Sequence, residues 1–341
     1  MGSRPSSRAV RFLASSTLFL ALVTGCSGGG GGKAAPSGLP APAMGKVAAF
    51  DLSALSKKYD LNKTVVLMWS LVASDRAGNV YMLDWSLEHP DVMRMTPQGV
   101  VSRYVKVDFR VGAAGMVVRT DGSVVFGESP TSTGEFPVVN RDGTETVLKI
   151  SPEYRNAQPI GERPDGSLII SEGGNIWSLK GGKATQLYHQ SQPIDKYAVV
   201  DPSGTVYVVP ENLGDILAIP IGTKPYHVHV SGKVPGTDTA ITSLLPADLT
   251  PASAGGFYTL AENKANTEFS VVHVQGAKAT VLAKLQIKRT CLPGKQYPAL
   301  ANTCGAQAYI VQSGDRVLLL GNLTIHNSTP AEPALALKAA S

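Results

Sequence analysis

The chain has 341 residues, which allows one large β domain or two average ones, and 43% of them are apolar, enough to fill a core. Its 35 glycines and 23 prolines favour many turns over long helices. Three of the 31 Lys and Arg residues lie in the first 11 residues, so the remaining 28 face 26 Asp and Glu residues. This near balance, without a basic stripe interleaved with aromatic residues, gives no reason to expect nucleic acid as a partner.

The first 25 residues predict export. Three arginines precede the apolar run Phe12–Val23, which is too short to cross a bilayer as a permanent helix of about 20 residues. The run ends in V-T-G-C, which resembles a bacterial lipobox whose cysteine, here Cys26, receives diacylglycerol. We therefore expect a signal peptide over residues 1–25 and a lipid anchor at Cys26, on the extracytoplasmic face of the cell membrane or outer membrane. An ordinary secretory signal with a chance cysteine is the alternative.

Residues 26–44 are rich in Gly and then in Ala and Pro, which predicts a flexible linker before a domain over residues 45–341. With Cys26 lipidated, Cys291 and Cys304 remain. An even pair in an exported domain predicts a disulfide, which would contribute about 3 kcal/mol in the loop-entropy model. A metal or redox role is not expected, because the sequence has no CxxC and no third soft ligand nearby.

Residues 162–187 show how the domain is built. A Pro-Asp-Gly turn opens the apolar run Leu168–Ile170, a Glu-Gly-Gly turn reverses the chain into Ile176–Leu179, and a Gly-Gly turn leads into Ala184–Leu187. Asp-Gly and Gly-Gly between β-prone runs indicate hairpins, because Gly reaches the positive φ values that tight turns need. With the preceding run, the segment predicts a four-stranded antiparallel meander.

The meander repeats along the chain. Its first turn recurs at steps of 38 to 58 residues, with glycine at positions Gly78, Gly122, Gly166, Gly204, Gly256 and Gly314. A second turn follows 15 to 21 residues later in five of the units, at Gly99, Gly143, Gly181, Gly222 and Gly276. Two turn families in phase indicate a repeat of several strands rather than scattered hairpins.

Four short strands in a unit of this length are typical of a β-propeller, in which the units pack radially and close a ring. The length predicts six blades of four antiparallel strands in an all-β monomer. Seven blades stay open, because the long steps after Gly204 could hide a degenerate blade. We expect Lys46–Phe50 to complete the last blade and Asp51–Tyr59 to form one or two helical turns.

The units resemble the NHL type of β-propeller and the neighbouring gluconolactonase/regucalcin and streptogramin-lyase propellers. The resemblance covers most of residues 65–325, and it rests on the Asp-Gly turn, the β run, an acidic residue, a Gly/Asn turn and a further strand. It implies the fold but carries over neither enzymatic activity. The first inner strand lacks the glutamate with which gluconolactonase-like propellers bind metal, and the inner strands before Asp-Gly lack the histidines of streptogramin-lyase propellers.

An acidic residue recurs six or seven positions after the turn glycine, where the NHL-like pattern ends the second strand of each blade. These residues are Asp84, Glu128, Glu172, Glu211 and Glu262. Equivalent places in successive blades share one face of the ring, so the acids could form a partial ring for a divalent cation such as Ca²⁺ or Mg²⁺ or for a cationic ligand. Alternatively, each carboxylate accepts backbone N–H groups of its own turn.

Histidines offer weaker candidates. His89 and His189 fall in connections expected on the acid-bearing face, where a histidine near carboxylates could act as a general base. Chance placement of two loop histidines is the alternative. His227 and His229 alternate on a strand expected at the outer edge of its blade, where a solvated edge is favoured over a rim metal site.

The sequence thus predicts a membrane-anchored binding or scaffold module, with no chemistry of its own, for a protein, glycan or small ligand. The alternative is a metal-assisted lyase or lactonase-like hydrolase that uses the same propeller face. No G-x-S-x-G, H-E-x-x-H or P-loop motif points to another reaction.

Overall fold

The structure, a computed structural model, describes residues 38–56, 58–59, 61, 71–84, 90–107, 115–127, 134–149, 157–194, 197–209, 211–265, 268–286, 308–323 and 332–340. These residues form strands and two short 3-10 helices, η1 (Leu52–Leu55) and η2 (Ile241–Ser243). No helix among them is long and apolar enough to cross a membrane.

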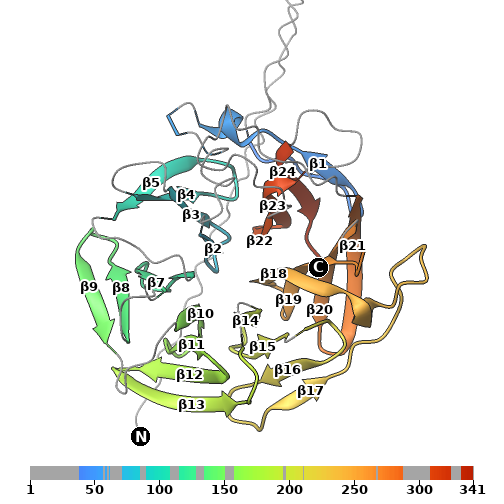
Figure 1. The fold of residues 1–341 in the computed structure, drawn as a ribbon. Coiled ribbons are helices and arrows are strands. Elements are labelled where there is room, and N and C mark those ends of the chain that lie inside the picture. Colours follow the sequence, from blue (N-terminus) through green and yellow to red (C-terminus); the bar gives the residue numbers. More distant parts are fainter. Residues whose placement is uncertain are drawn as a thin grey trace, which may run out of the picture. The chain divides into compact units, whose positions relative to one another are not determined.

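Six antiparallel sheets of four strands each stand in a ring, which confirms the predicted six-bladed β-propeller (Figure 1). Blades 1 to 3 consist of β2 (Val72–Ser74), β3 (Val80–Asp84), β4 (Asp91–Met95), β5 (Val101–Lys106), β6 (Met116–Val118), β7 (Val124–Phe126), β8 (Glu135–Val139), β9 (Glu145–Lys149), β10 (Gln158–Glu162), β11 (Leu168–Glu172), β12 (Asn175–Lys180) and β13 (Lys183–His189). Blades 4 to 6 consist of β14 (Ala198–Val200), β15 (Val206–Val208), β16 (Ile216–Ile219), β17 (Tyr226–Val228), β18 (Leu245–Pro251), β19 (Phe257–Glu262), β20 (Glu268–Gln275), β21 (Lys278–Gln286), β22 (Ala308–Ser313), β23 (Arg316–Leu323), β24 (Glu332–Lys338) and β1 (Val47–Ala49).

The sixth blade joins the two ends of the domain. β1 pairs antiparallel with β24, with Val47 opposite Leu337, and becomes the outermost strand of a sheet whose other three strands come from the end of the chain. The predicted closure by Lys46–Phe50 is therefore confirmed. Closing the ring in this way leaves no blade with a missing strand.

The long steps after Gly204 hold no seventh blade in the described residues. The added length between Gly204 and Gly256 forms the connection from β17 to β18, which contains η2 and an isolated bridge between Lys233 and Ala240. Part of the length before Gly314 goes into β20 and β21, strands of 8 and 9 residues.

The turn glycines adopt the backbone that the repeat predicts. All six first-turn glycines have φ between +59° and +87°, and the five second-turn glycines lie between +55° and +85°. Residues with a Cβ avoid this region, which is why glycine recurs there. We call the end of the propeller that carries the first turns the turn rim. The second strand of each blade starts there and runs to the opposite rim.

Six hydrophobic clusters form the core, one between each pair of neighbouring blades. Successive residues of a second strand point to opposite faces of their sheet. Leu168 and Ile170 therefore pack toward blade 2, whereas Ile169 packs toward blade 4. Because both faces are buried, these strands are apolar throughout instead of alternating with polar residues.

Side chains also join neighbouring blades at the turn rim. One hydrogen bond at each blade junction involves a first turn or the inner-strand end beside it: Tyr104 Oη to Gly122 O (2.7 Å), Arg119 Nη2 to Gly166 O (3.3 Å), Arg163 Nε to Gly204 O (2.9 Å), Gly256 N to Asp201 Oδ2 (3.2 Å), Ser253 N to Gln312 Oε1 (2.7 Å) and Ser313 Oγ to Gly78 O (2.9 Å). These bonds fix the turn rim as a continuous belt of contacts.

Candidate functional site

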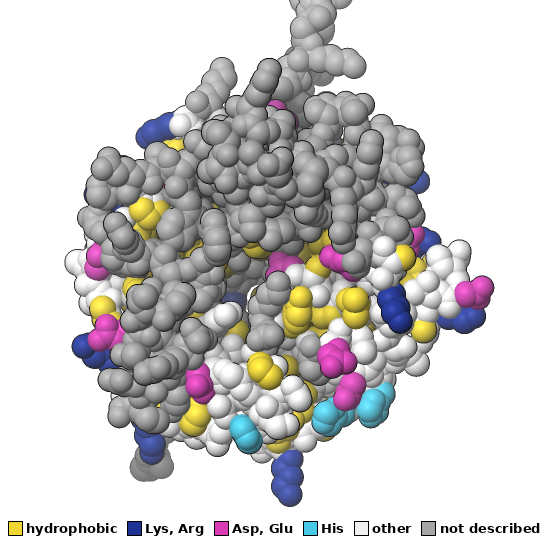
Figure 2. Space-filling view, viewed as in Figure 1, with side chains coloured by type: hydrophobic (Ala, Val, Ile, Leu, Met, Phe, Trp, Pro, Cys, Tyr) yellow, Lys and Arg dark blue, Asp and Glu magenta, His cyan; other side chains and the backbone are white. Residues whose placement is uncertain are grey.

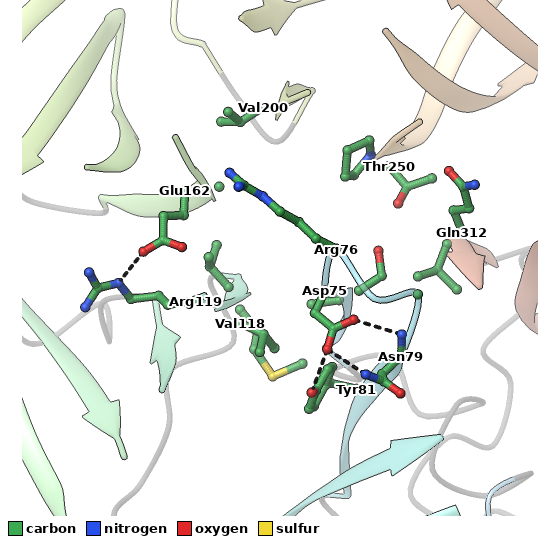
Figure 3. Close-up of a pocket in the computed structure, with 18 of the residues that line it drawn as sticks. Asp75, Arg76, Asn79, Tyr81, Val118, Arg119, Glu162, Val200, Thr250 and Gln312 are labelled. Carbon is green, nitrogen blue, oxygen red and sulfur yellow. Dashed lines mark hydrogen bonds and ion pairs between the residues drawn. The ribbon is translucent and has the colours of Figure 1, made fainter. Parts of the chain in front are cut away.

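A cavity of about 770 Å³ lies along the centre of the ring and reaches the turn rim. All six blades line it, through their innermost strands β2, β6, β10, β14, β18 and β22 and through first turns next to these strands. Its walls combine aliphatic side chains such as Val118 and Val200 with charged and polar ones (Figure 3). A cavity of this size and mixed character is typical of a site for a small molecule.

Asp75 shows how the acids of this cavity are engaged. It follows β2, and its carboxylate accepts hydrogen bonds from Asn79 N (2.9 Å), Asn79 Nδ2 (2.8 Å) and Tyr81 Oη (2.9 Å) (Figure 3). Burial, together with this carboxylate, raises the pKa of Tyr81 far above its ordinary value. Tyr81 therefore stays a neutral donor to Asp75.

Glu162 and Arg119 join blades 2 and 3 across the cavity wall. Arg119 Nε lies 3.0 Å from Glu162 Oε1, and the second carboxylate oxygen accepts Thr120 N (2.7 Å) and Thr120 Oγ1 (2.6 Å). The Glu162 side chain is only 7% exposed, and Arg119 also lies 3.4 Å from Asp121. Both charges are thus used within the protein.

Two further acidic residues of the cavity also accept hydrogen bonds from backbone N–H groups. Asp201 accepts Ser203 Oγ and Thr205 N as well as Gly256 N of the next blade. Asp248 accepts Ile310 N at 2.8 Å. The carboxylates around the cavity therefore contribute to the architecture of the turn rim, and few of their oxygen atoms remain to bind a ligand.

The cavity extends outward at one place, between blades 1 and 2. We call this extension the recess; it is lined by Tyr81, Arg94 of β4, Tyr104 of β5 and Arg141 of the second turn of blade 2. The two tyrosine rings meet edge to face with centroids 5.0 Å apart, and the Arg94 guanidinium lies 5.8 Å from the Tyr104 ring centroid. In the other blades the lining residues come from the innermost strands and the first turns.

Three arginines of the cavity lack an ionic or hydrogen-bonding partner in the described part of the chain. They are Arg76, whose side chain extends across the middle of the cavity in Figure 3, and Arg94 and Arg141 of the recess. Arg76 and Arg141 are exposed, whereas the Nε atom of Arg94 is buried without a hydrogen bond. A buried donor without an acceptor is costly, so the Nε atom does not explain the placement of Arg94 by a bond of its own.

The predicted acidic residues lie at the other end of the blades. β3, β11 and β19 end at Asp84, Glu172 and Glu262, and the exposed Glu211 follows three residues after β15. Asn175 Nδ2 donates hydrogen bonds to the carboxylate of Glu172 (3.0 Å) and to its backbone carbonyl oxygen (3.1 Å). This bond is local to the turn, but its donor is the Asn175 side chain and not a backbone N–H group. The turn-stabilising alternative and ligand binding by the acids both stay predictions.

Of the described histidines, His189, His227 and His229 lie on or beside outermost strands, whereas His273 is buried on β20, the third strand of blade 5. His189 ends β13, the outermost strand of blade 3, and its Nδ1 lies 2.8 Å from Asn175 Oδ1. His227 of β17 and the neighbouring His229 place their Nδ1 atoms 2.7 Å and 3.9 Å from one oxygen of Asp215. Figure 2 shows histidines at the outer edge of the molecule and single acidic side chains spread over this face.

Several predicted residues cannot be placed. Cys26, Cys291, Cys304, Glu128 and His89 lie outside the described residues, and so does the side chain of Asp84. Within the described part of the chain, no group of three or more His, Cys, Asp or Glu residues could hold a metal ion. The predicted Ca²⁺ or Mg²⁺ site and the disulfide therefore stay predictions.

Reasoning from the sequence missed the arginines of the cavity. Arg76, Arg94 and Arg141 occupy three different places in two blades, so no period in the sequence relates them. A usable signal was the position of Arg76 and Arg141, each two residues before a turn glycine, Gly78 of blade 1 and Gly143 of blade 2. Among the described residues of the other blades, no third strand contributes a side chain to the cavity as β4 does with Arg94.

Comparisons with known proteins show the fold alone. Neither the models of known protein families nor the curated proteins include a match to this chain. Among solved structures, it is similar to a gluconolactonase from Xanthomonas campestris, with 13% identity, TM-score 0.51, and 81% of this chain and 88% of the other covered. It is also similar to the calcium-binding protein regucalcin from Agrobacterium tumefaciens (12%, TM-score 0.48, 86% and 94% covered) and to virginiamycin B lyase from Staphylococcus aureus (11%, TM-score 0.46, 80% and 81% covered).

Proposed function

We propose that this protein is a lipid-anchored binding module of the extracytoplasmic membrane face, whose propeller holds a small ligand in its central cavity. The observation that carries the proposal is the cavity of about 770 Å³, lined by all six blades and containing three arginines without partners among the described residues. Of the predicted ligands, a small molecule fits best, because the cavity is enclosed by the innermost strands of the ring.

The turns and strands that line the cavity are held in place by contacts between blades, which supports a binding role. Hydrogen bonds between blades hold the first turns, and the six hydrophobic clusters hold the strands behind them. A preformed site loses little conformational entropy when a ligand enters, so affinity does not have to offset a rearrangement.

Thermal unfolding with a panel of sugars, amino acids, organic acids and nucleotides tests this function. A solute that binds only the folded protein raises its Tm by mass action. We expect one class to do so and the effect to disappear in Ser74→Trp, which places an indole at the cavity wall. The matched control is Thr146→Trp on the exposed outer strand β9. A Tm shift that persists in Ser74→Trp, or no shift with any class, would contradict the proposal.

The anchor has a separate test. Export and lipid attachment rest on the sequence of the leader, in which V-T-G-C ends the apolar run. We expect Cys26→Ser to release the protein from membranes or to leave the precursor uncut. Unchanged membrane fractionation together with an unchanged precursor size would remove the anchor from the proposed function.

A metal-assisted lactonase-like or lyase reaction at the opposite rim is the second candidate. It is supported by the shared fold with a gluconolactonase and by Glu172 and Glu262 at the ends of their second strands. If it is correct, Ca²⁺, Mg²⁺, Mn²⁺ or Zn²⁺ raises the Tm and Glu172→Gln abolishes the rise. Failure of all four ions to shift the Tm of the purified protein would eliminate this candidate.

A further inference from the structure

Among the described residues, the cavity wall has more arginine N–H donors without a partner than carboxylate oxygens without one. The formal charges of the lining nearly balance, with four arginines against five carboxylates. Asp75, Glu162 and Asp201, however, have both carboxylate oxygens engaged within the protein. Of the four arginines that line the cavity, only Arg119 has such partners among the described residues. A ligand that complements this wall must therefore bring acceptors.

The recess concentrates these donors. Arg94 and Arg141 both line it beside Tyr104, whose hydroxyl already donates to Gly122 O at 2.7 Å. Arg94 approaches the ring face of Tyr104, which orients the guanidinium and shields one of its sides. Arg76 reaches into the cavity from the first turn of the same blade.

We propose that the cavity binds a small organic anion, with its carboxylate or phosphate group in the recess against Arg94 and Arg141 and with Arg76 contacting the rest of the molecule. Planar guanidinium groups present paired N–H donors that match the oxygens of both groups. The aliphatic wall, with Val118 and Val200, accommodates the uncharged part of the solute. This inference rests on the proposed function and names its ligand class.

Stability distinguishes a binding arginine from a structural one. Arg163 is buried and donates to Gly204 O and Ile219 O, so its removal would leave carbonyl groups without donors. Arg94 has no such bonds in the described residues. We therefore expect Arg94→Met to keep or slightly raise the Tm of the free protein while it weakens anion binding.

Calorimetric titration of the purified protein with succinate, with inorganic phosphate and with glucose tests the proposal. We expect one or both anions to bind, with an affinity that falls as NaCl is added, and glucose not to bind. Arg94→Met should weaken that binding about tenfold or more, and Arg76→Met less, since charged hydrogen bonds contribute more when they are buried. Binding of succinate indicates a carboxylate ligand, and binding of inorganic phosphate indicates a phosphate ligand.

Arg103→Gln is the matched control, because it removes the same charge from β5 but lies outside the cavity, beside Asp91 at 3.5 Å. Equal binding by the protein, Arg94→Met and Arg103→Gln would overturn the inference, and so would absence of binding by both anions. If a neutral solute of the Tm panel binds and Ser74→Trp blocks it while both anions fail, the proposed function stands and only the anion inference falls.

Discussion

The two rims of the propeller use their charged residues differently. At the turn rim, Glu162 is buried, pairs with Arg119 and accepts two further bonds from Thr120, so one side chain ties two blades together. At the opposite rim, Glu172 bonds to Asn175, three residues away in the same blade. A recurring acid at the opposite rim is thus compatible with local turn chemistry, whereas the turn rim depends on contacts between blades.

The comparison also separates repeated residues from singular ones. Turn glycines recur in every blade because each blade needs the same backbone conformation. The arginines proposed to bind a ligand break that pattern, since Arg76, Arg94 and Arg141 come from non-equivalent places. In this propeller the residues that recur in every blade form the scaffold, whereas the arginines of the proposed site do not recur.

The largest expected effect tests the crowding of the turn rim. Gly78 has φ +78°, and a Cβ there would collide with the backbone N of Gly314 in the neighbouring blade. We expect Gly78→Ala to lower the free energy of unfolding by about 3 kcal/mol, from left-handed strain plus the collision. Gly166, at φ +79° with open space around it, is the control, and Gly166→Ala should cost about 1 kcal/mol. Equal losses in urea unfolding would refute close contact between these first turns.

The next effect compares the two rims directly. Glu162→Gln removes the charge that pairs with Arg119, and because Glu162 is 7% exposed while Arg119 is 30% exposed, we expect a loss of about 2 kcal/mol. Glu172→Gln keeps an acceptor for Asn175 and should cost less than about 0.5 kcal/mol. Urea unfolding of the two variants measures the difference. If Glu172→Gln were the more damaging, the assignment of the architectural carboxylates to the turn rim would be wrong.

The smallest effect is a pH dependence at blade 5. His273 is buried against Tyr258, and its Nε2 lies 3.2 Å from Gly255 O in the first turn. Burial lowers the pKa of His273 below its ordinary value; the hydrogen bond to Gly255 O opposes this shift, and the positive charge of Lys278 adds to it. A lowered folded-state pKa means that stability is present above the unfolded pKa of about 6.5 and is lost as the pH falls through the folded value.

His273→Phe isolates this contribution. The ring contact with Tyr258 is kept and the titrating group is removed, so the Tm of the variant should fall less steeply between pH 7.5 and pH 5 than that of the protein. The other described histidines are present in both proteins, so the difference in slope belongs to His273. Parallel slopes would show that His273 is protonated equally in the folded and unfolded states.

By itself the sequence determined the scaffold. Turn glycines at fixed places and short apolar runs between them were sufficient to predict the six blades and the N-terminal strand that closes the last one, because turn conformation and strand burial are local properties. It likewise carried the prediction of the leader and of Cys26, which the described residues do not reach.

Only the tertiary structure decided where the cavity and its free donors lie. Arg94 becomes a candidate ligand because the ring brings blade 2 against blade 1, and Arg119 is removed from the candidates because Glu162, 43 residues away, neutralises it. Whether a charged side chain has an ionic or hydrogen-bonding partner depends on residues that are distant along the chain, and no local sequence pattern predicts these pairs. The closing of the ring is the physical step that turns a repeated meander into a particular binding site.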